Sequence, residues 1–145
     1  MIAFDFGVKR IGVAVADTAI GIAHPLETIA AEDNRRRFER IGALVAEWRP
    51  ARLLVGFPEG GRDATHPLVP ALLRFERRLR TRFGLPLERV DETLSSWDAS
   101  RQLSARGILA RAQKGQLDAE AARLLLQDWL DGNALQRRAR DEGER

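Results

Sequence analysis

The stretch Ile2–Asp17 constrains the fold of this chain more than any other. It predicts two short apolar strands joined by a tight turn at Gly7–Arg10. Asp5 falls inside the first strand, and an ionised carboxylate in a buried strand is costly unless it is paired, hydrogen-bonded or bound to a metal. The turn adds a glycine, which lets backbone approach a ligand closely, and two cations, Lys9 and Arg10. The combination indicates metal and phosphate chemistry at the end of the first strand.

Length and composition favour one soluble domain. The chain has 145 residues, 44% of them hydrophobic and 31% charged, which is ordinary for a globular protein with a genuine core. The absence of cysteine excludes a disulfide framework and a thiolate metal site. No apolar run reaches membrane-spanning length and no charged region precedes a hydrophobic one at the start, so we expect a cytoplasmic protein without membrane contact.

The distribution of charge says more than its sum. The net charge is only +3, from 24 basic and 21 acidic side chains. Residues 99–117, however, contain no acid and four cations: Arg101, Arg106, Arg111 and Lys114. Two interpretations stay open, a solvated helix face or a contact with a polyanion, for which arginine forks suit phosphate groups.

Apolar spacing predicts the remaining elements in chain order. After the hairpin we expect an edge strand at His24–Ile29, a helix at Asn34–Trp48, a strand at Arg52–Phe57, a helix at Leu68–Phe83, a strand at Leu85–Val90, a helix beginning at Ser95 and a last helix at Leu117–Asp131. A hairpin followed by β-α-β units predicts an α/β fold, with a mixed five-stranded sheet flanked by helices. Residues 1–132 form the predicted domain and residues 133–145 a disordered tail.

The first predicted helix is strongly amphipathic. Its expected inner face carries Phe38, Ile41, Leu44, Val45 and Trp48, and its expected outer face carries Arg35, Arg36, Arg37, Glu39 and Arg40.

Three acids stand out by position. Asp5 lies in the first strand, and Glu92 follows the last strand at its carboxyl end, where open α/β sheets place ligand sites. Asp118 lies in the first turn of the last helix on its apolar stripe, where Ala121 and Ala122 are small enough to let the helix approach the sheet. Carboxylate clusters favour Mg²⁺ or Mn²⁺, and two such ions can activate water and stabilise the leaving oxygen in phosphodiester cleavage.

Each acid also has a simpler interpretation. Asp118 would stabilise a helix N-terminus through the macrodipole, Glu92 would be a surface acid, and Asp5 would be a hydrogen-bonded turn acid.

Taken together, the motifs resemble the YqgF family, also called RuvX, of the RNase H-like superfamily. The matching stretches are Asp5–Gly7, Lys9–Val15 with Asp17, Val55–Pro58, Arg82–Pro86, Asp91–Ser95, Asp118–Ala122 and Leu125–Leu130. The likeness covers about residues 1–132. Two features depart from the family pattern: the loop Glu59–Ala64 lacks a longer polar signature ending in Asp-Gly, and Val8 stands where a small hydroxyl residue is common.

The resemblance implies an RNase H-like fold and a metal-dependent nuclease. The family is associated with maturing the 5′ end of 16S rRNA from its precursor, and was described earlier as a Holliday-junction resolvase. Its acidic residues map onto Asp5, Glu92 and Asp118, with the first-strand aspartate bridging two Mg²⁺ or Mn²⁺ ions. In this hypothesis Lys9 and Arg10 hold phosphate beside the site. The predicted contacts to the nucleic-acid backbone are Arg101, Arg106, Arg111 and Lys114.

Three other functions stay open at this point. The same site could resolve four-way DNA junctions, which requires a homodimer for symmetric cutting, whereas RNA cleavage is compatible with a monomer. An actin-like phosphotransferase is disfavoured because the chain is too short for two lobes and lacks a second glycine-rich phosphate loop. A non-catalytic nucleic-acid-binding domain would follow if the acids bound no metal.

Overall fold

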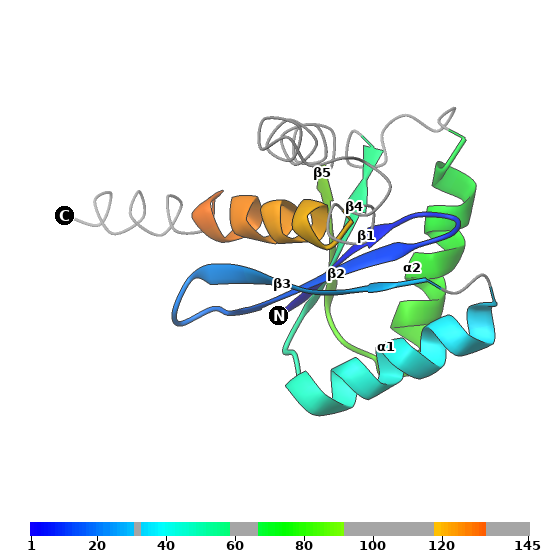
Figure 1. Ribbon diagram of the computed structural model, residues 1–145, viewed down its shortest axis with the longest axis horizontal. Coiled ribbons are helices and arrows are strands. Elements are labelled where there is room, and N and C mark those ends of the chain that lie inside the picture. The colour runs from blue at the N-terminus through cyan, green and yellow to red at the C-terminus, as the bar shows by residue number, and fades with distance from the viewer. Residues whose placement is uncertain (31–32, 59–66, 92–117, 133–145) are drawn as a thin grey trace.

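A five-stranded sheet organises the computed structural model, which describes residues 1–30, 33–58, 67–91 and 118–132 (Figure 1). The strands are β1 (Ile2–Phe6), β2 (Ile11–Asp17), β3 (Ile22–Ile29), β4 (Leu53–Phe57) and β5 (Leu87–Asp91), in the spatial order β3-β2-β1-β4-β5. β2 runs antiparallel to β1 and β3, whereas β4 is parallel to β1 and β5 is parallel to β4. The sheet is therefore mixed, as the element order predicts.

The helices form a layer on each side of the sheet. α1 (Asn34–Trp48) and α2 (Val69–Phe83) pack on one face, and the helix of residues 118–132 packs on the other (Figure 1). Side chains of a strand alternate between faces, so Ile2, Phe4 and Phe6 of β1 join the core under α1 and α2, while Ala3 joins the core under residues 118–132. Asp5 therefore lies on the face that the last helix covers.

The last helix comes unusually close to β2. The strand presents Ala14 and Ala16 to it, and at Gly12 there is no room for any side chain. A Cβ added to Gly12 would lie 1.9 Å from the backbone carbonyl oxygen of Asp118. The absence of a side chain at this position is what lets the first turn of the helix rest directly on the strand.

Two polar side chains fix the other half of the same helix. The Gln127 amide accepts a hydrogen bond from the Ala23 backbone nitrogen at 2.9 Å and donates one to the Gly21 carbonyl at 3.0 Å. The Trp129 indole donates to Glu88 Oε2 at 2.6 Å. The helix is thus tied to the β3 side and to β5, so its position over the sheet is determined at both ends.

Most predicted elements are confirmed within the described residues. The hairpin, the edge strand with its proline, the interior strand and the two amphipathic helices all form, and Gly84 ends α2 with a left-handed backbone. β5 begins two residues later than predicted, since pairing starts at Leu87, opposite Leu53, and Pro86 has no N–H to donate. The helix predicted from Ser95 and the tail at 133–145 lie outside the described residues. No helix in the described ranges is both long and apolar enough to cross a bilayer.

Two residues of α1 lie on the face opposite to the one that the helical spacing predicts. Arg37 was expected in solvent but is buried, with 4% of its surface exposed, because it turns inward to the β1–β2 turn and the Phe6 ring. Trp48 was expected in the core but is 48% exposed, because the end of α1 borders a surface cavity.

The contact at Gly12 generates a stability prediction. We expect Gly12→Ala to lower the free energy of unfolding by about 3 kcal/mol, at the upper end of overpacking costs, because the clash is with backbone. The matched control is Gly42→Ala in α1, where the nearest atom to a new Cβ is 4.0 Å away and alanine should add up to about 1 kcal/mol. Urea unfolding measures both, and equal stabilities for the two variants would contradict this account of the helix contact.

Candidate active site

Asp5 and Asp118 meet through Gly12. In the β1–β2 register, Asp5 pairs with Gly12. The backbone of Asp118 packs against Gly12, since a Cβ added to Gly12 would lie 1.9 Å from the Asp118 carbonyl oxygen. Two acids that are separated by more than a hundred residues in sequence therefore flank one glycine, on one face of the sheet.

Arg10 holds the Asp118 carboxylate. Its Nε donates to Asp118 Oδ2 at 2.8 Å, and the two side chains are 36% and 26% exposed. An ion pair with this exposure contributes at most about 1 kcal/mol to stability, so its main effect is to orient the two groups. A guanidinium has five N–H donors in a fork, so Arg10 can hold Asp118 and still donate to a phosphate oxygen.

The Gly7–Arg10 turn is held from the opposite side by Arg37. The Arg37 Nη2 donates to the Val8 carbonyl, and its Cζ lies 5.8 Å from the centre of the Phe6 ring. The turn itself is tight, because a Cβ at Gly7 would lie 2.6 Å from the Arg10 carbonyl oxygen. Sequence analysis missed this role of Arg37. Its position four residues before the buried Ile41 was the available signal, because that spacing places it on the inner stripe of α1.

Of the other predicted site residues, Lys9 is described by the structure and the rest are not. Lys9 is exposed at the tip of the turn. β5 ends at Asp91, paired with Phe57, and the next residue in sequence is the predicted ligand Glu92. Among the described residues no three His, Asp or Glu side chains form a metal-binding group. The predicted residues that lie outside the described ranges are Glu92, Arg101, Arg106, Arg111 and Lys114, together with the loop Glu59–Ala64.

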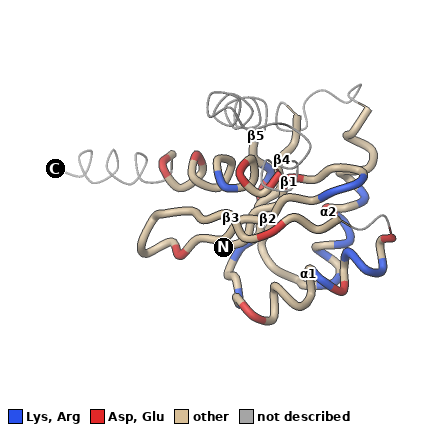
Figure 2. The backbone as a smooth tube through the Cα atoms, viewed as in Figure 1, with Lys and Arg blue, Asp and Glu red and all other residues tan. Residues whose placement is uncertain are grey.

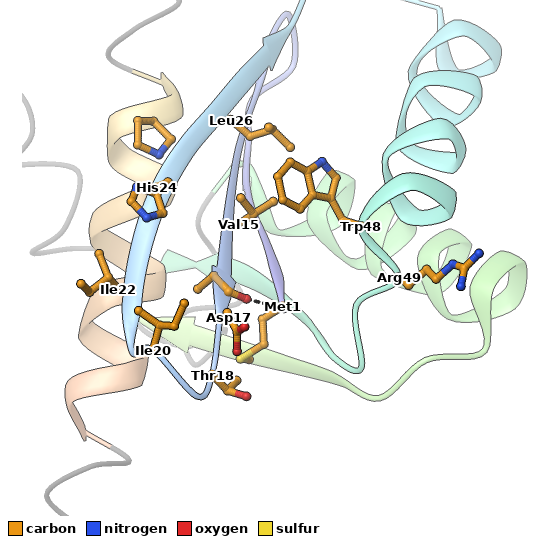
Figure 3. A pocket seen from close by; sticks show the side chains of 12 residues that line it. Met1, Val15, Asp17, Thr18, Ile20, Ile22, His24, Leu26, Trp48 and Arg49 are labelled. Atoms are coloured by element: carbon orange, nitrogen blue, oxygen red, sulfur yellow. Dashed lines mark hydrogen bonds between the residues drawn. The ribbon is translucent and has the colours of Figure 1, made fainter.

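A cavity of about 560 Å³ lies at the opposite edge of the sheet. It borders Met1, at the start of β1, and Figure 3 shows Val15, Leu26 and Trp48 close together on one wall. Asp17 also lines the cavity, and its carboxylate accepts a hydrogen bond from the Ala19 backbone nitrogen at 2.9 Å.

The Met1 amino group borders this cavity and is held by a hydrogen bond to β2. It donates to the Ala16 carbonyl at 2.8 Å (Figure 3), and burial lowers its pKa, partly opposed by the charge of Asp17. The cavity is lined by both polar and apolar side chains, and neither Asp5 nor Asp118 borders it. The candidate active site is therefore the cluster around Asp5, where the two predicted acids meet.

The sequence model of one protein family, described as "RuvX: Holliday junction resolvase", matches residues 1–132. The chain belongs to the RuvX family. This confirms the resemblance drawn from the motifs.

Two similar relatives match this chain over nearly their full length. A protein of Methylobacillus flagellatus named "Putative pre-16S rRNA nuclease" is 48% identical over 134 residues, which cover 92% of either chain. A protein of Dechloromonas aromatica with the same name is 47% identical over 131 residues, covering 90% of either chain.

A solved structure, "T. thermophilus RuvC in complex with Holliday junction substrate", is similar to this chain with a TM-score of 0.53 at 20% identity. The match covers 92% of this chain and 96% of that one. The likeness confirms the predicted RNase H-like fold.

The turn generates the second prediction. Arg37→Gln should lower the free energy of unfolding by about 1–3 kcal/mol, because it removes a buried charged donor and leaves the Val8 carbonyl without its partner. It should also speed amide hydrogen exchange in the Gly7–Arg10 turn. Arg36→Gln, at the exposed neighbouring position, is the control and should stay within about 0.5 kcal/mol of the parent. If both variants matched the parent in stability and exchange, Arg37 would not be holding the turn.

Proposed function

We propose that this chain is a divalent-metal-dependent nuclease that hydrolyses phosphodiester bonds in structured RNA, with maturation of the 5′ end of 16S rRNA from its precursor as its reaction. The observation that carries the proposal is the meeting of Asp5 and Asp118 at Gly12. The family assignment and the names of the two relatives support the reaction class and the RNA substrate.

The acids present suit Mg²⁺ or Mn²⁺. Carboxylate oxygens are the hard ligands that these ions prefer. Asp5 is partly buried, and among the described residues no side chain forms a hydrogen bond or ion pair with its carboxylate, so that charge is open to a cation. We propose Asp5, Asp118 and Glu92 as the ligands of two ions. Glu92 is included because it follows β5, whose carboxyl end lies at the same edge of the sheet as that of β1.

Bound ions of this kind activate a water molecule and stabilise the leaving oxygen of a phosphodiester. The chain's own residues do the positioning. Asp5 is held on a paired strand, and Arg10 keeps the Asp118 carboxylate oriented while offering its remaining donors to the scissile phosphate. Lys9 adds a second cation at the tip of the turn. In this proposal Arg101, Arg106, Arg111 and Lys114 follow the nucleic-acid backbone.

A second candidate substrate is a four-way DNA junction. The description of the family and the fold likeness to a RuvC bound to such a junction favour it. Comparing cleavage of precursor 16S rRNA with cleavage of a junction, at matched salt and metal concentrations, separates the two. Preference for the junction, together with a dimeric mass in solution, would replace the RNA assignment, because symmetric cutting requires two sites.

The third prediction concerns the acids themselves. Asp5→Asn and Asp118→Asn should each lower the cleavage rate by more than about 100-fold, beyond the usual cost of losing a group that merely supports a ligand. Both variants should keep the parent's circular dichroism spectrum, and calorimetry should show weaker Mn²⁺ binding.

Asp17→Asn is the matched control, because Asp17 ends β2 at the opposite edge of the sheet and should leave cleavage and Mn²⁺ binding unchanged. Full cleavage by folded Asp5→Asn protein would exclude the metal-ligand role of Asp5. Parent protein that binds nucleic acid but neither Mn²⁺ nor Mg²⁺ would instead favour a non-catalytic binding domain.

A further inference from the structure

The positive charge of the chain is concentrated on α1 and α2. These two helices contain nine arginines and three glutamates, a net charge of +6, whereas the whole chain has +3. The other 115 residues therefore carry a net charge of −3. Figure 2 shows the basic positions along both helices, on the face of the sheet opposite the helix of residues 118–132.

Several of these arginines are already neutralised. Arg35 pairs with Glu39 at 3.2 Å, and Arg40 is bound by Glu27. The glutamate of α2, Glu76, is buried and shared between Arg89 at 2.7 Å and Arg80 at 3.5 Å.

A second group of arginines has no ion pair with any residue that the structure describes. Its members are Arg36 on α1 and Arg74, Arg77, Arg78 and Arg82 on α2, of which Arg82 lies over the Phe38 ring. The first turns of both helices also contain no acid. The positive charge on this face is therefore available to an external anion.

Two of the unpaired arginines line one hollow. Arg74 and Arg78 lie one turn apart on α2 and face Asn34 at the start of α1, around a hollow of about 90 Å³. Its other lining residues include Phe6 and Phe75, whose rings are 4.8 Å apart and are only 8% and 4% exposed as residues. Rings buried this deeply offer no face for a base to stack on, whereas the arginine forks and the asparagine amide are donors suited to phosphate.

The hollow lies beside the candidate active site but on the other face of the sheet. Phe6 follows Asp5 directly and ends β1, so the two sites share one end of that strand. The Gly7–Arg10 turn lies between them, since Arg37 of α1 binds it at Val8 and Arg10 reaches Asp118.

We propose that Arg74, Arg78 and Asn34 form a second phosphate-binding site for the substrate's backbone, distant from the scissile bond. The site rests on the proposed nuclease function and extends it, because the substrate then passes over the Gly7–Arg10 turn from one face of the sheet to the other. A substrate that reaches both sites must be long or folded, and its recognition here is independent of base sequence.

Salt-dependent binding tests the site without relying on catalysis. Binding of a fluorescently labelled, structured precursor RNA is measured by anisotropy over a range of salt concentrations. The measurements use the Asp5→Asn protein, so that the RNA is not cleaved during binding. Adding Arg74→Gln and Arg78→Gln should reduce the slope of log K against log salt by about 1.4–1.8, the value for two lost phosphate contacts. Arg49→Glu is the control, because it changes the net charge by the same −2 at the other end of α1 and should leave the slope unchanged.

Cleavage supplies the second measurement. Here Arg74→Gln and Arg78→Gln are combined in a protein that keeps Asp5. This variant should cleave the structured RNA more slowly than the parent does. It should cleave a short oligonucleotide that spans the scissile bond at the parent rate. An unchanged salt slope, or the same loss in Arg49→Glu, would overturn the second site. Those results would leave the nuclease intact, whereas absence of metal-dependent cleavage by the parent would overturn the proposed function and leave the binding result standing.

Discussion

The structure depends on one contact, in which the backbone of Asp118 packs directly against Gly12. Without a side chain at Gly12, the last helix can lie directly on β2, and its first turn comes to the residue that pairs with Asp5. Gln127 and Trp129 fix the far half of the helix, so the acid at its start is carried on a rigid element. Groups held on rigid elements keep the geometry that metal-assisted chemistry requires.

The Gly7–Arg10 turn connects this contact to the rest of the molecule. On one side Arg10 binds Asp118, and on the other the buried Arg37 binds the Val8 carbonyl. The turn is therefore fixed from both helical layers, although its tip residues Val8 and Lys9 are exposed. In the proposed binding mode a nucleic acid contacts both faces at this edge, where the acids lie on one face and arginines without an ion pair to any described residue lie on the other.

Local sequence patterns predicted the elements well and the tertiary contacts only in part. The two short apolar runs joined at Gly7–Arg10 and the helical spacing of Asn34–Trp48 were sufficient to place β1, β2 and α1. The small residues Ala121 and Ala122 correctly indicated that the last helix faces the sheet, and both are buried. Two features could not be predicted from residue spacing along the helix, because they depend on partners that are distant in sequence. They are the inward turn of Arg37 toward Val8 and the exposure of Trp48 beside a cavity. The pairing of Glu76 with Arg89 of β5 likewise depends on a distant partner, whereas its contact with Arg80 follows from i,i+4 spacing within α2.

Anomalous diffraction from crystals soaked in Mn²⁺ shows whether Asp5 and Asp118 share a metal ion. We expect a manganese peak within direct coordination distance of both the Asp5 and Asp118 carboxylates, beside Gly12. Manganese that contacts only one of these carboxylates, or binds only elsewhere such as at Asp17, would contradict this expectation.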